Sequence, residues 1–157
     1  MKQMRLFLMS GVPGSGKSTY GKKFVKEHPE VVYISRDEIR MSIITDNDQY
    51  FSKEKQVFRE FAAAAKTVLD NGGTVLLDAS HLNWPSVNKT LRALNWKDDY
   101  TIIRMDTSYD KAIAQNAKRS GRALVPETEI KNMWDKMDDP TKYCNNVIFV
   151  EWRDLNE

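Results

Sequence analysis

The segment Ser10–Thr19 reads SGVPGSGKST and completes the pattern GxxxxGK(S/T), directly after the apolar run Met4–Met9. Glycines in such a loop let several backbone N–H groups point at one anion. Lys17 adds a positive charge for the β- and γ-phosphates, and the hydroxyl of Ser18 is a ligand for Mg²⁺. The segment is therefore predicted to be a phosphate-binding P-loop that takes ATP. Its predicted nucleotide contacts are Gly11, Pro13, Gly14, Ser15, Gly16, Lys17, Ser18 and Thr19.

A carboxylate and a guanidinium follow the second apolar run, in residues 35–40 (SRDEIR). Ligands in an open α/β sheet gather at the carboxyl ends of the strands, so these side chains should face the same crevice as the P-loop. Ser35 and Glu38 fit a capping box, which places Asp37 and Arg40 on one face of the new helix. We predict Asp37 as the general base and Arg40 as the ligand of an acceptor phosphate. The alternative is that Asp37 only complements the helix dipole and Arg40 is solvated.

Thr74–Asp78 is an apolar run that ends in an acid, which is the shape of a Walker B strand. Asp78 is predicted to lie beside the Mg²⁺ ion or the Lys17 and Arg40 side chains. Ala79 follows in place of the glutamate with which motor ATPases activate water, and this favours transfer over hydrolysis. The alternative role of Asp78 is a strand-end cap. His81 is a weaker candidate, because a lone histidine is more often structural.

Residues 118–122 (KRSGR) lie between two predicted helices, with breaks at Gly121 and Pro126. An arginine-bearing segment between helices is suited to a lid over transferring phosphates, which we place around residues 117–126. Arg119 and Arg122 are predicted to stabilise the charge on the moving γ-phosphoryl group. The alternative is a solvated charge cluster at a helix C-terminus.

These candidates require alternating strands and helices. Strand-type runs cover Arg5–Ser10, Val31–Ser35, Thr74–Asp78, Tyr100–Asp106 and Val147–Trp152. Helical patterns run from Lys17 to about Lys26, up to Gly72, from near Pro85 to Leu94, from Ser108 to about Lys118, and from Pro126 to about Met137. The apolar face of the longest helix comprises Val57, Phe58, Phe61, Ala65, Val68 and Leu69, which we assign to the core. The pattern indicates an α/β fold with a parallel sheet. By analogy at the level of the fold, we expect the P-loop kinase arrangement, a five-stranded parallel sheet in the order 2-3-1-4-5 flanked by helices.

The length of 157 residues fits a single domain, residues 1–157, and the net charge of +2 means that any basic nucleic-acid footprint must be local. The one cysteine, Cys144, excludes an intrachain disulfide framework and is typical of a reducing cytoplasm. No run reaches membrane-spanning length and no signal-peptide layout is present, so we expect a cytoplasmic protein without membrane contact.

Taken together, these motifs resemble the 5′-kinase domain of phage-type polynucleotide kinase over nearly the whole chain. The resemblance is carried by the P-loop, residues 35–43 (SRDEIRMSI), the strand ending at Asp78, Asn83, and the stretch 116–126. It implies that Asp37 is the general base, that Arg40 holds a 3′-phosphate of the acceptor, that Asp78 organises the site, and that Arg119 contacts nucleotide phosphates. Tyr50 and Phe51 begin a run that is similar to one lining the acceptor channel in that family.

The chain departs from that family at several positions. Gln115 stands where the bifunctional phage enzyme has a further lid arginine, for which we expect Arg122 to compensate, and Ala79 replaces a residue with a hydroxyl group. No DxDxT motif of a phosphatase is present. The resemblance implies a Mg²⁺-dependent transfer of the γ-phosphate of ATP to the 5′-hydroxyl of DNA or RNA. The alternatives are a kinase of a nucleoside, nucleotide or other metabolite, a kinase of a modified base in DNA, and a nucleotide-switched binding module.

Overall fold

The computed structural model describes residues 3–151, apart from the side chain of Arg122. The strands are β1 (Leu6–Ser10), β2 (Val31–Ser35), β3 (Thr74–Asp78), β4 (Thr101–Asp106) and β5 (Val147–Glu151). They form one parallel sheet in the order β2-β3-β1-β4-β5. The predicted α/β class and strand order are confirmed. The predicted end of the last strand, Trp152, lies outside the described residues.

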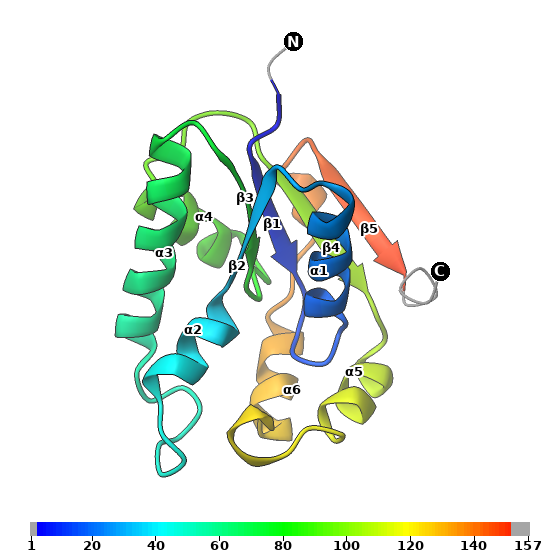
Figure 1. Cartoon of the computed structure of the whole chain (residues 1–157). Helices are drawn as coiled ribbons and strands as arrows, with labels where there is room; N and C mark the ends of the chain where they lie inside the picture. Colours follow the sequence, from blue (N-terminus) through cyan, green and yellow to red (C-terminus); the bar gives the residue numbers. More distant parts are fainter. Residues whose placement is uncertain (1–2, 152–157) are drawn as a thin grey trace.

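Helices connect the strands. They are α1 (Lys17–Glu27), α2 (Arg36–Ile43), α3 (Glu54–Asp70), α4 (Trp84–Ala93), α5 (Tyr109–Asn116) and α6 (Glu127–Asp135), with short 3₁₀ turns η1 (Gly121–Ala123) and η2 (Pro140–Lys142). In Figure 1, α1 lies in front of the sheet, whereas α5 and α6 lie below it, beyond the carboxyl ends of the strands. All strands point towards that end, so the loops that follow them meet there.

The hydrophobic core has two layers and an extension. On one face of the sheet, Phe61, Ala65 and Leu69 of α3 pack with Val87 and Leu91 of α4. Tyr20, Phe24 and Val25 of α1 cover the other face. A third cluster joins α5 and α6 at the carboxyl end of the sheet, with Val12, Ala112, Val125 and Ile130 buried in it. These clusters fix the helices that carry the loops of the site.

The starts of α2 and α4 differ from expectation. The Ser35 hydroxyl accepts a hydrogen bond from the Glu38 N–H at 3.1 Å. The Glu38 side chain does not complete the predicted capping box, since its carboxylate lies 3.8 Å from the Lys22 ammonium, an ion pair with the neighbouring helix. A full capping box instead starts α4, where Asn83 and Ser86 bond each other reciprocally. Half of the predicted capping box is therefore present, since Ser35 accepts from the Glu38 N–H while the Glu38 side chain faces Lys22.

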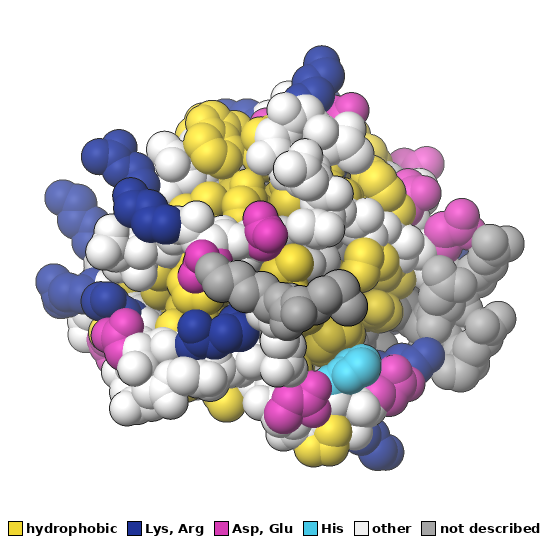
Figure 2. Space-filling view, turned by 90° about the horizontal axis from the view of Figure 1, so that it is seen from above, with side chains coloured by type: hydrophobic (Ala, Val, Ile, Leu, Met, Phe, Trp, Pro, Cys, Tyr) yellow, Lys and Arg dark blue, Asp and Glu magenta, His cyan; other side chains and the backbone are white. Residues whose placement is uncertain are grey.

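Charge is unevenly distributed over the surface. Figure 2 looks onto the amino ends of the strands, opposite the P-loop, and shows Lys and Arg side chains gathered along the left margin, on the side of α3 and α4. Although the net charge is only +2, basic side chains are thus concentrated on the side of the molecule that carries α3 and α4. Within residues 3–151, none of the helices has the length and apolar character to cross a membrane.

Candidate active site

The P-loop connects β1 to α1 and depends on two glycines in the left-handed region. Gly14 has φ of 83°, and a Cβ at this position would lie 2.2 Å from the carbonyl oxygen of Ala112. Gly16, with φ of 96°, begins α1. The hydroxyl of Thr107 donates to the carbonyl of Ser15 at 2.7 Å and ties the loop to the end of β4. Only glycine permits this close turn of the backbone.

Lys17 and Ser18 follow the loop and lie beside Asp78. The Lys17 ammonium donates to the carbonyl of Val12 at 3.2 Å, and its burial lowers its pKa while Asp78 opposes that change. The Ser18 hydroxyl donates to Asp78 Oδ2 at 2.8 Å. The Tyr33 hydroxyl donates to the same oxygen, and burial together with Asp78 raises the pKa of this phenol, so it stays a donor.

This arrangement fits the ligand preference of Mg²⁺. A hydroxyl and a carboxylate oxygen 2.8 Å apart, at the foot of a phosphate-binding loop, are hard donors of the kind that magnesium accepts together with phosphate oxygens. Asp78 is almost completely buried. The hydrogen bond from the Tyr33 hydroxyl fixes the position of its carboxylate.

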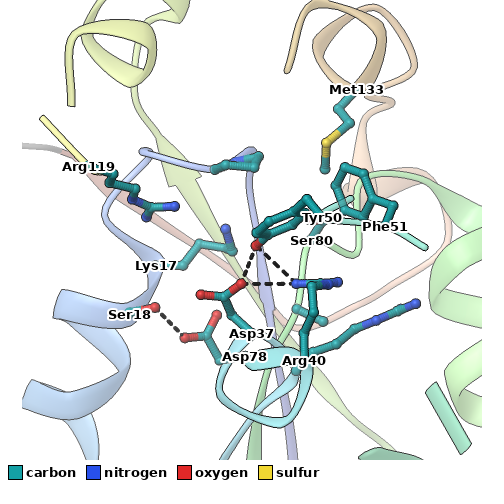
Figure 3. A pocket seen from close by; sticks show the side chains of 13 residues that line it. Lys17, Ser18, Asp37, Arg40, Tyr50, Phe51, Asp78, Ser80, Arg119 and Met133 are labelled. Atoms are coloured by element: carbon teal, nitrogen blue, oxygen red, sulfur yellow. Dashed lines mark hydrogen bonds and ion pairs between the residues drawn. The ribbon is translucent and has the colours of Figure 1, made fainter. Parts of the chain in front are cut away.

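Asp37 lies across the cavity from the P-loop, with one carboxylate oxygen held from two sides (Figure 3). Tyr50 donates its hydroxyl to Asp37 Oδ1, and Arg40 Nη1 donates to the same atom at 3.0 Å. Arg40 Nη1 also donates to the Tyr50 oxygen at 3.0 Å. Within the described part of the chain, Asp37 Oδ2 makes no hydrogen bond, so one oxygen is anchored and the other is available for a ligand.

Arg40 is buried and engaged by a second acid. Its Nε and Nη2 donate to the two oxygens of Glu54 at 2.6 and 2.9 Å. Although burial opposes it, the hydrogen bonds to Glu54 raise the pKa of Arg40. Asp37 Oδ1 and the Tyr50 oxygen, which bond each other, are both acceptors for Nη1, so all three guanidinium nitrogens have protein partners. The predicted clamp on an acceptor phosphate stays a prediction.

Arg119 lines the same cavity from the lid side (Figure 3). The base of the lid is fixed by Asn116, whose side chain donates to the carbonyl of Val125 at 2.7 Å and accepts from its N–H at 3.1 Å. This pairing closes residues 117–124 into a loop, from which Arg119 reaches the cavity. The other predicted lid cation, Arg122, has a side chain outside the described residues.

Comparison with known families identifies the fold. A family model described as an AAA domain, AAA_33, matches residues 6–140. The chain belongs to this family. The matched range includes the P-loop described above, and P-loop kinases use ATP, generally with Mg²⁺.

Two curated relatives are similar over most of this chain. A protein of Autographa californica nuclear polyhedrosis virus, whose name is that of a bifunctional polynucleotide kinase/RNA ligase, is 30% identical over 84% of this chain. A bifunctional shikimate kinase/3-dehydroquinate synthase of Thermotoga maritima is 34% identical over 85% of this chain. The chain spans only 20% and 26% of the lengths of these two relatives.

Solved structures show the same fold. A structure described as a kinase from Chloroflexus aurantiacus superposes with a TM-score of 0.73 at 14% identity, over 96% of this chain and 89% of that one. A chain of the Pnkp1/Rnl/Hen1 RNA repair complex superposes with a TM-score of 0.67 at 21% identity, over 87% of this chain and 48% of that one. The chain therefore has the P-loop kinase fold.

The structure brings nine of the predicted site residues to one cavity and adds others. The predicted residues that line it are Pro13, Lys17, Ser18, Asp37, Arg40, Tyr50, Phe51, Asp78 and Arg119. Arg36 and Met133 line it too, and Glu54 and Tyr33 hold its side chains from behind. No sequence signal points to Glu54 or Tyr33, because their contacts with Arg40 and Asp78 join segments that are distant in sequence. The cavity lining does not include the other predicted loop contacts, of which Gly11, Gly14, Ser15 and Gly16 belong to the loop itself and Thr19 lies in α1.

His81 has a structural environment. Its two ring nitrogens bond the carbonyl of Met9 at 2.9 Å and the hydroxyl of Thr90 at 3.0 Å. Burial lowers the pKa of His81 to about 4, so the ring is neutral near pH 7. This agrees with the expectation that the lone histidine is part of the scaffold.

Proposed function

We propose that the protein transfers the γ-phosphate of ATP to the 5′-hydroxyl of a DNA or RNA end. The observation that carries this proposal is the half-engaged carboxylate of Asp37. Its Oδ1 is anchored by Tyr50 and Arg40, its Oδ2 has no hydrogen bond within residues 3–151, and Asp37 lines the cavity together with Lys17 and Arg119. A carboxylate held in this way beside a P-loop is placed to accept a proton from an attacking hydroxyl.

In this reaction the acceptor oxygen gives its proton to Asp37 Oδ2 as it bonds to the γ-phosphorus. The bond from that phosphorus to the β–γ bridging oxygen breaks, and the electron pair leaves with ADP. Lys17 and the loop N–H groups hold the β- and γ-phosphates, and Arg119 stabilises the charge on the moving group. Ser18 and Asp78 would hold Mg²⁺, which when bound neutralises negative charge on the phosphates.

Several features support a nucleic-acid acceptor. Tyr50 and Phe51 form an edge-to-face aromatic pair at the cavity, with ring centroids 4.5 Å apart, and can stack against a terminal base. One relative bears the name of a polynucleotide kinase, and one solved neighbour belongs to an RNA repair complex. The catalytic cavity contains the cations Lys17, Arg36, Arg40 and Arg119 against the acids Asp37 and Asp78.

A small-molecule kinase is the second candidate. It is favoured by the relative named as a shikimate kinase, which is 34% identical to this chain. Such an enzyme would use the same donor site and the same base on a compact hydroxylated acceptor.

An acceptor panel with radiolabelled ATP and Mg²⁺ tests the proposal. The panel contains 5′-hydroxyl DNA and RNA oligonucleotides, nucleoside 3′-monophosphates, bare nucleosides and shikimate. We expect transfer to oligonucleotides, and a fall of about 10²–10⁴-fold in kcat for Asp37→Asn with ATP affinity retained. Asp70→Asn, at an exposed aspartate on α3, is the control that should match wild type. Transfer to shikimate alone would promote the second candidate, and full activity of Asp37→Asn would exclude the assigned base.

A further inference from the structure

A second cavity adjoins the first on the side of α3 and α4. Arg36, Arg40, Phe51, Ala79, Ser80 and Met133 line both cavities. The second cavity extends away from the P-loop, and its remaining walls are Glu54, Phe58, His81, Leu82, Asn83, Ser86, Lys89 and Thr90. A ligand whose hydroxyl lies at Asp37 can therefore extend into this adjoining cavity.

The walls of the second cavity carry more positive than negative charge. Arg36, Arg40 and Lys89 face one carboxylate, that of Glu54. Both Glu54 oxygens are taken by Arg40, and Arg36 Nη2 shares one of them at 2.9 Å. Among residues 3–151, Lys89 makes no ion pair, so its ammonium is uncompensated.

Phe58 brings the two less committed cations together. The guanidinium carbon of Arg36 lies 5.3 Å from the centroid of this ring, and the Lys89 ammonium lies 4.3 Å from it. Both cations therefore lie near the same ring, and an anion bound in this cavity would be attracted by each of them. Phe58, which helical spacing assigns to the core, is partly buried and packs against the core, and it also lines this cavity.

Arg36 has an unused donor in this region. Its Nε is buried and has no hydrogen-bond partner among the described residues. A buried N–H without a partner costs free energy unless a ligand or water satisfies it. Burial also lowers the pKa of Arg36, a cost that an anion would offset.

We propose that the second cavity binds a phosphate group of the acceptor and that Arg36 and Lys89 hold it. This inference rests on the proposed function. In a nucleic acid whose 5′-hydroxyl lies at Asp37, the nearest anion is the phosphodiester on the 3′ side of the same nucleoside. Arg40, which is committed to Glu54, Asp37 and Tyr50, then serves mainly to position the base Asp37.

A binding measurement on Lys89 variants tests this site apart from catalysis. The protein is saturated with ADP and Mg²⁺, which fills the P-loop, and is titrated by calorimetry with a nucleoside 3′-monophosphate, the bare nucleoside, inorganic phosphate or shikimate. We expect Lys89→Ala to bind the 3′-monophosphate about fivefold more weakly. Lys89→Arg should retain the affinity, and the bare nucleoside should bind equally to all variants. Lys66→Ala, at another exposed helical lysine, is the matched control.

The outcomes separate the two proposals. Unchanged binding of the 3′-monophosphate by Lys89→Ala would overturn the phosphate site, as would an equal loss for the bare nucleoside. A selective loss for shikimate, with its carboxylate, would overturn the nucleotide assignment. If Lys89→Ala loses the 3′-monophosphate but wild type phosphorylates no oligonucleotide or nucleotide, the site stands and the proposed transfer fails. Weaker binding of inorganic phosphate by the same variant supports the site independently of the nucleoside.

Discussion

Glu54 is the residue on which the arrangement of Arg36 and Arg40 depends, and Glu54→Gln is the sharpest perturbation of it. The variant keeps the size of the side chain but removes the charge that pairs with both guanidinium groups. Arg40 is only 6% exposed, so it cannot turn to solvent when its partner is lost. In the variant, the buried charge of Arg40 therefore loses its main ion pair while Arg36, a second cation, remains beside it.

The expected cost follows from this geometry. Removing one partner of a buried ion pair costs about 3–5 kcal/mol of unfolding free energy. The Glu54 side chain is 25% exposed, and water that reaches it lowers the expected cost to about 2–3 kcal/mol. For a chain of this size the change corresponds to a fall of about 4–12 °C in Tm.

The effect should also depend on pH. Despite burial, the hydrogen bonds from Arg40 hold the pKa of Glu54 below its ordinary value of 4.5. A carboxyl group with a lowered folded-state pKa stabilises the protein above its unfolded pKa, and this stability is lost as the pH falls through the folded pKa. The difference between wild type and Glu54→Gln should therefore be full near neutral pH and shrink below 4.5.

Urea unfolding followed by circular dichroism measures both effects. Asp70→Asn, which breaks the exposed pair of Asp70 with Lys66 at 3.3 Å, is the control and should cost less than about 0.5 kcal/mol. The reasoning is refuted if Glu54→Gln unfolds within that margin of wild type at neutral pH, or if its deficit persists undiminished in acid.

Two further predictions follow from other contacts. Tyr50→Phe removes a hydrogen bond to the Asp37 carboxylate, so kcat for an oligonucleotide should fall about tenfold or more with KM for ATP unchanged. Tyr100→Phe, at a phenol outside both cavities, should keep the wild-type rate, and equal rates for the two variants would argue against the anchoring role. Burial lowers the pKa of His81 from 6.5 to about 4. Between these pH values His81 is protonated in the unfolded chain and neutral in the folded chain. The free energy of unfolding should therefore decline as the pH falls from 6.5 to about 4. In His81→Gln this part of the decline should disappear, and an identical slope in denaturant titrations of the two proteins would contradict it.

Much of the fold was predictable because the determining signals are local. The P-loop spacing places Lys17 and Ser18, and each apolar run that ends near a polar residue marks a strand end. The strand order required analogy at the level of the fold, since parallel pairing joins segments that are distant in sequence.

The site was less predictable, because its decisive contacts are long-range. Glu54 contacts Arg40 only when α3 packs against α2. Tyr33 and Asp78 stand on the adjacent strands β2 and β3, so they meet only when these strands pair. Helical spacing places Phe58 on the inner face of α3 but cannot tell a packed ring from one that lines a cavity. Arg36 carries no comparable sequence signal, because its contact with Glu54 forms only in the folded chain.

The short helix α5 lies against the donor loop at Ala112 and Asn116 and holds the base of the lid at Asn116. Its start follows Thr107, which bonds the P-loop at Ser15, and the carbonyl of Ala112 lies against Gly14. Its last residue, Asn116, clasps Val125. α5 thus connects the P-loop mechanically to the lid segment that carries Arg119. A side chain added at Gly14 would push on this helix, so damage to the P-loop would also misalign Arg119, three residues beyond the end of the helix.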